Sequence, residues 1–188
     1  MNDDIFGFTL STFDGPCYAE QTTVSGLGVG GVFTVERYDS EGNYIETWIA
    51  KNIIPNAVLN DILNVYFNAG SQSTAFYIGM VDNVGFSAFA ATDTMASHSG
   101  WTENTATSNT SRPAWTPAAA ASQSISNPAA WVIMMNASAT IKGFFMTTSN
   151  TLGGTSGNLD ATASLPAPQP CNAGDVLKGT YAINATTS

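Results

Sequence analysis

The stretch VFTVERYDSEGNYIETWI, residues 32–49, decides the fold. Its first half alternates apolar and polar side chains, which places Phe33 and Val35 on one face of a β-strand. Residues 39–43 are turn formers and include a glycine, and the alternation resumes in residues 44–49. The stretch therefore predicts a β-hairpin.

The apolar period changes directly after this hairpin. Pro55 is acceptable in the first turn of a helix, and Gly70 follows the last apolar residue of the segment. The spacing between apolar residues becomes three and four, which predicts one amphipathic helix. Its apolar residues are Val58, Leu59, Ile62, Leu63, Tyr66 and Phe67.

The rest of the chain reads as short strands separated by loops. Between residues 82 and 130 we expect two hidden extended segments, because a structureless connection of that length is uncommon inside a domain. The frequent turn signals predict a mainly β fold, an antiparallel β-sandwich of the jelly-roll kind with one amphipathic helix. The expected strands are residues 76–81, 101–107, 122–126, 131–135, 141–146 and 176–183.

The beginning of the chain differs from this body. Residues 1–30 show no sustained period and run into the glycine-rich residues 26–31. We therefore predict an extended N-terminal arm with a flexible hinge, followed by the β-sandwich domain in residues 31–188. A glycine-rich loop that binds phosphate lies between a strand and a helix. Here a strand follows the glycines, so nucleotide binding is not expected.

Charge limits the partners. The chain has 5 Lys+Arg and 14 Asp+Glu, a net charge of −9, and 10% charged residues, where about 25% is usual. The five basic residues are scattered, so neither nucleic acid nor anionic lipid is an expected partner. No apolar stretch is long enough to span a membrane. Met1 begins no basic region followed by an apolar run, so we expect synthesis in a cytoplasm.

The acidic residues are concentrated at one end. Eight of the 14 lie within residues 1–46, where Arg37 is the one basic residue, so this segment carries −7. It is either a solvated edge or a segment that docks on a basic surface of a partner. Asp3 and Asp4 are its candidate contact residues.

The metal-ligating residue types are scarce. The sequence has one histidine and two cysteines, Cys17 and Cys171, without the spacing of a zinc site. We therefore expect no metal and no cofactor. In a reducing cytoplasm two thiols are favoured over a disulfide, although pairing stays possible if the two ends of the chain meet.

His98 is the one side chain that would ordinarily titrate near neutrality. Asp93, Ser97, Ser99 and Glu103 are close in sequence, but no strained elbow around a serine is present. We interpret His98 as a loop residue that forms a hydrogen bond. Paired carboxylates for glycoside hydrolysis would have to come from distant parts of the chain. No catalytic residue is predicted.

Two aromatic residues differ from the others in their local sequence. Trp101 and Trp115 occur in loop-like surroundings, and large amphipathic rings in such places often anchor a subunit contact. Ordinary burial is the alternative. We treat both as candidate interface residues.

The block DTMASHSGWTE, residues 93–103, followed by RPAW, residues 112–115, resembles a string found in small virion structural proteins of tailed bacteriophages. His98 and Arg112 belong to this block and are further candidate interface residues. The resemblance extends over roughly residues 31–185. It also includes Asn52 with the helix, residues 75–80, residues 143–148 and residues 153–155.

The resemblance implies a β-rich, non-enzymatic component of a virion. We expect a capsid cement or decoration protein, made in the host cytoplasm, that forms a homotrimer and contacts the major capsid protein or neighbouring virion proteins. The alternatives are a tail or head fibre or appendage that contacts host glycan and, from another class, a carbohydrate-active enzyme.

Overall fold

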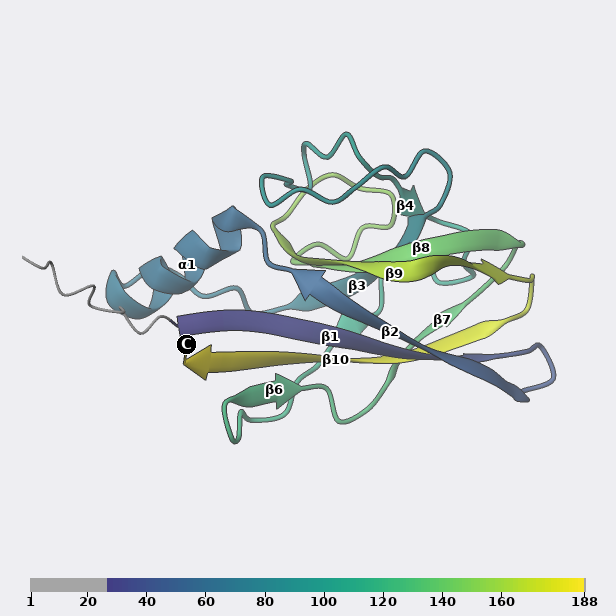
Figure 1. Cartoon of the computed structure of the whole chain (residues 1–188), viewed down its shortest axis with the longest axis horizontal. Helices are drawn as coiled ribbons and strands as arrows, with labels where there is room; N and C mark the ends of the chain where they lie inside the picture. The colour runs from purple at the N-terminus through teal and green to yellow at the C-terminus, as the bar shows by residue number, and fades with distance from the viewer. Residues whose placement is uncertain (1–26, 188) are drawn as a thin grey trace, which may run out of the picture.

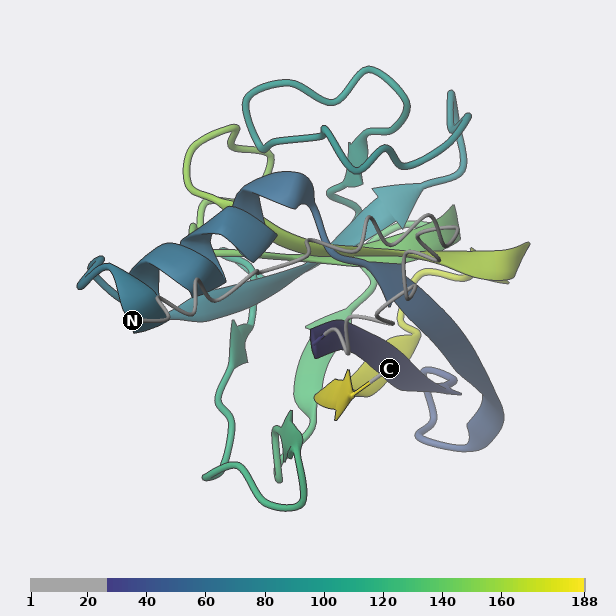
Figure 2. The ribbon, with the colours of Figure 1, turned by 60° about the vertical axis from the view of Figure 1, so that its left-hand side comes forward.

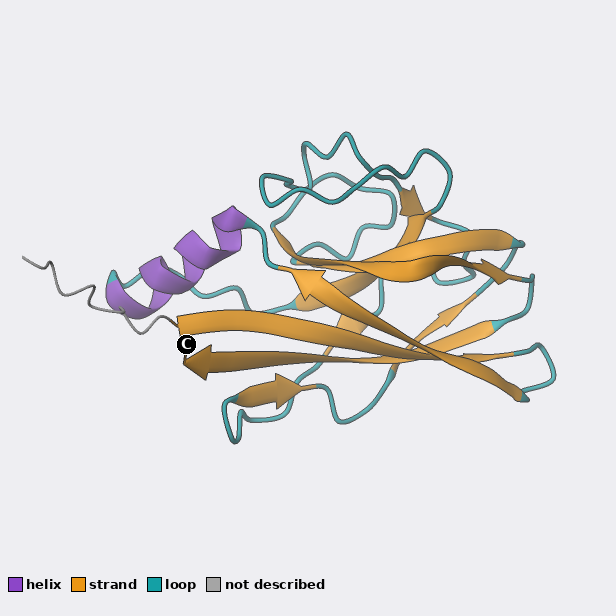
Figure 3. Ribbon diagram, in the orientation of Figure 1, coloured by secondary structure: helices purple, strands orange, loops and turns teal. Residues whose placement is uncertain are grey.

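A computed structural model describes residues 27–187, and it holds ten strands and one helix in that range (Figures 1 and 3). The prediction of a mainly β, antiparallel fold with one helix is confirmed. The elements are β1 Leu27–Tyr38, β2 Tyr44–Ile53, α1 Asn56–Phe67, β3 Phe76–Asp82, β4 Glu103–Asn104, β5 Ala114–Trp115, β6 Ser124–Ser126, β7 Trp131–Met134, β8 Ala139–Thr147, β9 Leu159–Cys171 and β10 Val176–Thr187.

The strands form one antiparallel sheet in the order β4-β3-β8-β9-β2-β1-β10-β6, with β5 added to β3 and β7 added to β10. Strand β2 joins the two halves, because most of it pairs with β1 whereas Asn52 and Ile53 pair with β9. Figure 2 shows β2 crossing from the half that holds β1 and β10 to the half that holds β8 and β9. The sheet curls into a half-barrel, and two separate sandwich sheets are not confirmed.

The main core lies between the two halves of the curled sheet. Phe33 on β1 stacks on Tyr181 of β10 with ring centroids 4.0 Å apart and on Phe144 of β8 at 6.0 Å. The neighbouring residue Phe145 belongs to a second, smaller core with Trp101, on the other face of β8. Residues 144 and 145 are both fully buried because β8 is covered on both faces.

Several local predictions are confirmed. The hairpin of β1 and β2 turns at residues 39–43, and Phe33 and Val35 are buried on its inner face. Strands β3, β7, β8 and β10 cover the other main segments. Strands β4 and β6 are short pieces of the two hidden segments expected between residues 82 and 130.

One local prediction is wrong, and one strand was not predicted. Strand β1 begins at Leu27, so residues 28–31 are paired with β10 and do not form a hinge. Close packing explains Gly31, since a Cβ there would meet the Tyr181 ring and the Ala182 carbonyl oxygen. Strand β9 was not predicted at all. The arm itself, residues 1–26, lies outside the described residues.

Candidate functional site

The loop that precedes β4 is organised around Trp101. Its indole Nε1 donates to Oδ2 of Asp93 at 3.0 Å, and the same oxygen accepts from the Ala90 backbone N–H at 2.9 Å. The indole is 1% exposed and packs 5.1 Å from the Phe145 ring. Trp101 is therefore a core residue, and the expectation that it anchors a subunit contact is wrong.

His98 covers the Trp101 indole from the loop side. The two rings are stacked with centroids 3.9 Å apart, and His98 Nδ1 lies 3.0 Å from the Trp101 carbonyl oxygen. The interpretation of His98 as a hydrogen-bonded loop residue is confirmed. The carboxylates expected nearby have other partners, since Asp93 binds Trp101 and Glu103 binds Arg112. The structure does not bring these groups together as a catalytic set.

Arg112 holds three segments together from a fully buried position. Its guanidinium binds both carboxylate oxygens of Glu103 at 2.8 Å and donates to the carbonyl oxygens of Ser149 and Gly154 at 2.8 and 2.9 Å. It also lies 5.1 Å from the centroid of the Phe145 ring. With 1% exposure Arg112 offers nothing to a partner, so its assignment to an interface is corrected to a structural role.

Trp115 is likewise buried, with 5% exposure. Its Nε1 donates to the Tyr181 carbonyl oxygen at 3.0 Å, which ties β5 to β10 across the core. The interface expectation is therefore wrong for this residue as well.

Of the remaining candidates, Asp3 and Asp4 lie outside the described residues, as does Cys17. Burial raises the pKa of the Cys171 thiol to about 12.

Sequence reasoning did not identify the surface that α1 presents to solvent. No residue of α1 is buried. Tyr66 is 81% exposed and Phe67 76%, and their rings meet edge to face with centroids 4.8 Å apart. We call Leu59, Leu63, Tyr66 and Phe67 the α1 face; the apolar period predicts these side chains, but not that they stay uncovered.

A groove of about 340 Å³ lies between α1 and the sheet, and apolar side chains line most of it. Val58 and Val65 contribute from the helix, Val29 from β1 and Ile183 from β10. The helix therefore lies at the end of the molecule where β1 begins and β10 ends (Figure 1). No residue of the helix is buried against the sheet.

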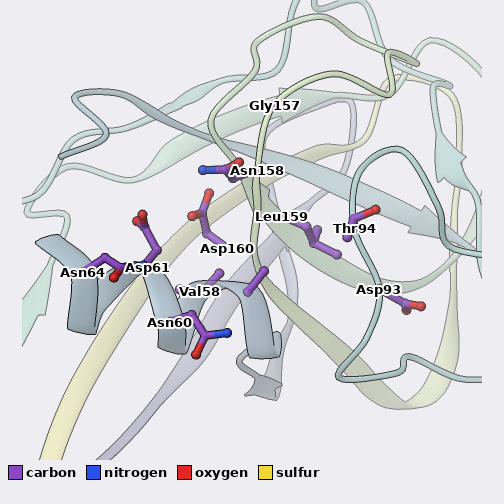
Figure 4. A pocket seen from close by; sticks show the side chains of 11 residues that line it. Val58, Asn60, Asp61, Asn64, Asp93, Thr94, Gly157, Asn158, Leu159 and Asp160 are labelled. Carbon is purple, nitrogen blue, oxygen red and sulfur yellow. The ribbon is translucent and has the colours of Figure 1, made fainter. Parts of the chain in front are cut away.

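A second cavity, of about 230 Å³, lies between α1 and the start of β9, and we call it the α1–β9 pocket. Figure 4 shows the carboxylates of Asp61 and Asp160 next to each other in it, with the side-chain amide of Asn158 close by. Asn64 lines the same pocket from the helix. Oxygen-bearing side chains from two distant parts of the sequence thus share one small space.

The position of Asp160 has a local structural cause. Leu159 pairs with Thr147 of β8 and Ala161 pairs with Met146, so Asp160 is the extra residue of a β-bulge. A bulge of this kind changes the direction of a side chain, which would otherwise alternate regularly between the two faces of the sheet. Asp160 is 6% exposed, and its Oδ2 is buried with no hydrogen-bond partner among the described residues.

The environment of Asp160 changes its acidity. Burial disfavours the charged carboxylate, and the neighbouring Asp61 adds repulsion. Together they raise the pKa of Asp160 to about 7. Neither residue belongs to an ion pair in the described part of the chain.

Between residues 27 and 187 no three His, Cys, Asp or Glu side chains come together as a metal cluster. No helix in that range has the length and hydropathy to cross a bilayer. Neither the protein-family models nor the curated proteins contain a match to the chain.

Proposed function

We propose that this chain is a non-enzymatic structural protein of a tailed-bacteriophage virion, a capsid cement or decoration protein that stabilises the shell through contacts between subunits. The resemblance of residues 93–103 and 112–115 to such proteins supports this proposal. In the fold this block supplies the Trp101 and Arg112 networks, so the resemblance concerns the scaffold of the loops and leaves the contact surface to be found elsewhere.

The observation that carries the proposal is the α1 face. An isolated helix of 12 residues is marginal in water, and most helices in proteins are stabilised by burying an apolar stripe. Of the apolar residues of α1 only Val58 and Val65 are half-buried against the sheet, whereas the α1 face is exposed, with Tyr66 81% and Phe67 76% accessible. A group of large apolar side chains exposed together on one element is typical of an interaction site.

We assign the α1 face to a neighbouring copy of the same chain in a homotrimer. Each copy carries a charge of −9, so two copies repel each other except where they meet through a neutral surface. Asp61 is the one charged residue of α1, and it lines the α1–β9 pocket rather than belonging to the α1 face. The α1 face therefore suits contact between like-charged copies.

A cement protein of this kind needs no chemical step. Because it binds the assembled shell and not the free subunits, it shifts the equilibrium toward the shell by mass action. Several copies joined in one trimer bind with an avidity far above that of a single contact. The acidic segment 1–46 is the part that would bind a basic surface of the major capsid protein or of neighbouring virion proteins.

Particle composition tests the proposal. Quantitative mass spectrometry of purified virions that carry the chain should give on the order of hundreds of copies per particle, as expected when a small protein covers a shell in many symmetric copies. The purified chain should sediment as a trimer. Absence from the particle, or a lone monomer that remains unattached to shells, would overturn the proposal.

The alternatives predict different results. A tail or head fibre or appendage, whose exposed Ser, Thr and Asn side chains contact host glycan, would be present at about six or twelve copies at one vertex. The neighbouring carboxylates of Asp61 and Asp160 in the α1–β9 pocket are the feature that favours a carbohydrate-active enzyme. Hydrolysis of host polysaccharide that Asp160→Asn abolishes in a folded chain would establish that class instead.

A further inference from the structure

The α1–β9 pocket contains a buried carboxylate whose negative charge is not balanced. Asp160 Oδ2 is inaccessible and has no hydrogen-bond partner in the described part of the chain, although buried polar groups are nearly always satisfied. Asp61, which lines the same pocket, makes the charged state of Asp160 less favourable. A folded protein that keeps two carboxylates together in this way needs either a proton or a cation between them.

The basic side chains of the chain do not supply that cation. Arg37 binds Glu46 and Asp175, and Arg112 binds Glu103. Lys142 donates to the Leu165 carbonyl oxygen at 2.6 Å, and Lys178 lies over the Tyr38 ring. Lys51 is exposed on β2 and does not line the pocket.

We infer that the α1–β9 pocket is a calcium site. Asp61 and Asp160 provide the charged ligands, and the side-chain oxygens of Asn64 and Asn158 provide the remaining protein ligands. All four are hard oxygen donors, which suit Ca²⁺ or Mg²⁺ and not zinc. Among residues 27–187, the side chains of Asn64 and Asn158 form no hydrogen bonds, so their carbonyl oxygens are available to a cation.

Calcium fits this set better than magnesium. Ca²⁺ accepts six to eight oxygen ligands in flexible geometry, including amide carbonyls and water, whereas Mg²⁺ requires a near-ideal octahedron and releases its waters reluctantly. Asn64 and Asn158 are both exposed at the edge of the pocket, where they can adjust and where water can fill the remaining positions.

The site would fix α1 to the sheet. Asp61 and Asn64 are on the helix, whereas Asn158 and Asp160 belong to the start of β9 and the turn before it. The turn is set by Gly157, whose φ of +89° is readily adopted by glycine alone. Calcium would thus replace the buried apolar contacts that α1 lacks. This inference rests on the pocket and is independent of the cement function.

The test uses the full-length chain, which is first treated with a chelator to remove bound metal and then separated from the chelator. Calorimetric titration with CaCl₂ should show one site per chain, and the site should be lost in Asp61→Asn and in Asp160→Asn. At a calcium concentration 100 times Kd, Tm should rise by roughly 5–10 °C. MgCl₂ at the same concentration should give a smaller rise. Glu41→Gln, which removes one charge from the exposed β1–β2 turn, is the matched control and should bind as the original chain does.

Two results would overturn the inference. One is a chain that binds no calcium and shows no rise in Tm, which would mean that Asp160 is kept neutral by a proton. The other is an equal rise in Tm for the original chain and both variants, which would place the calcium elsewhere. If Asp160→Asn does not fold, Asp61→Asn decides the question, since Asp61 is only half-buried.

Discussion

Arg112 and Glu103 form a two-pronged ion pair in the interior of the protein, with Nε to Oε1 and Nη2 to Oε2 both at 2.8 Å. The Glu103 carboxylate also accepts from the Gly153 backbone N–H at 2.7 Å. The pair therefore joins β4, the segment before β5 and the loop between β8 and β9. The two charges are tolerated in the water-excluded interior because each group neutralises the charge of the other and forms its hydrogen bonds.

Removing one partner of this pair should be costly. Arg112→Ala would leave Glu103 as a buried, unpaired charge, and the free energy of unfolding should fall by about 3–5 kcal/mol. Arg112→Lys should recover only part of this loss, because an ammonium cannot bind both oxygens in the same geometry. Urea unfolding followed by circular dichroism measures the change. Lys51→Ala, at an exposed site, is the control, and an equal effect there would contradict the assignment.

Trp101 should act as a core residue and not as a subunit anchor. Trp101→Ala removes a fully buried ring and should lower the free energy of unfolding by about 3–5 kcal/mol. Trp101→Phe keeps most of the packing but removes the donor to Asp93, so we expect a loss of about 1–3 kcal/mol. Val84→Ala, at a site 76% exposed, should change stability little. Sedimentation should show the same oligomer for folded Trp101→Phe as for the original chain.

Patterns of residue types within a short stretch of sequence predicted the elements whose structure depends on that stretch alone. The β1–β2 hairpin follows from alternation and turn residues, and α1 follows from its period of apolar residues. Strand β9 could not be predicted in this way, because Pro166, Pro168 and Pro170 argue against a strand. They are tolerated because, among residues 27–187, the part of this strand beyond Ser164 pairs only with β8, so its other edge needs no backbone donors.

The candidate sites depended on contacts between distant residues. Trp101 and Trp115 look like loop residues locally, yet Phe145 and Tyr181 bury them from other strands. The α1–β9 pocket combines Asp61 with Asp160, which are far apart in sequence, and a bulge aims Asp160 into it. One sequence without its fold gives no signal for such a pairing, apart from an acidic residue in the otherwise uncharged β9.

The α1 face should control self-association. Tyr66→Gln combined with Phe67→Gln keeps the helix propensity and removes the two most exposed apolar side chains of the helix. Because neither ring is buried in the chain, unfolding by urea should change little, while the trimer should dissociate at concentrations where the original chain stays associated. Sedimentation velocity measures this.

The matched control for the α1 face is Ile49→Gln, which changes a side chain 58% exposed on the outer face of β2. It should leave the oligomer intact. Dissociation of both variants to the same extent would show that general surface hydrophobicity, and not the α1 face, holds the copies together.

Asp160 should make the calcium-free protein less stable as the pH rises. Its pKa is about 7 in the folded chain and 3.8 ordinarily, so between these values the folded state binds one proton more than the unfolded state. The free energy of unfolding should therefore fall by about 1 kcal/mol per pH unit from pH 4 to pH 7, and this contribution should level off above pH 7. Asp61 and Asp93 also line the pocket, but Asp93 is already bound to Trp101.

In chelator, Asp160→Asn should lose this slope and exceed the original chain in stability at pH 8, because it removes a buried charge without emptying the space. Equal slopes for the two proteins in urea titrations across this range would mean that Asp160 is not the titrating group.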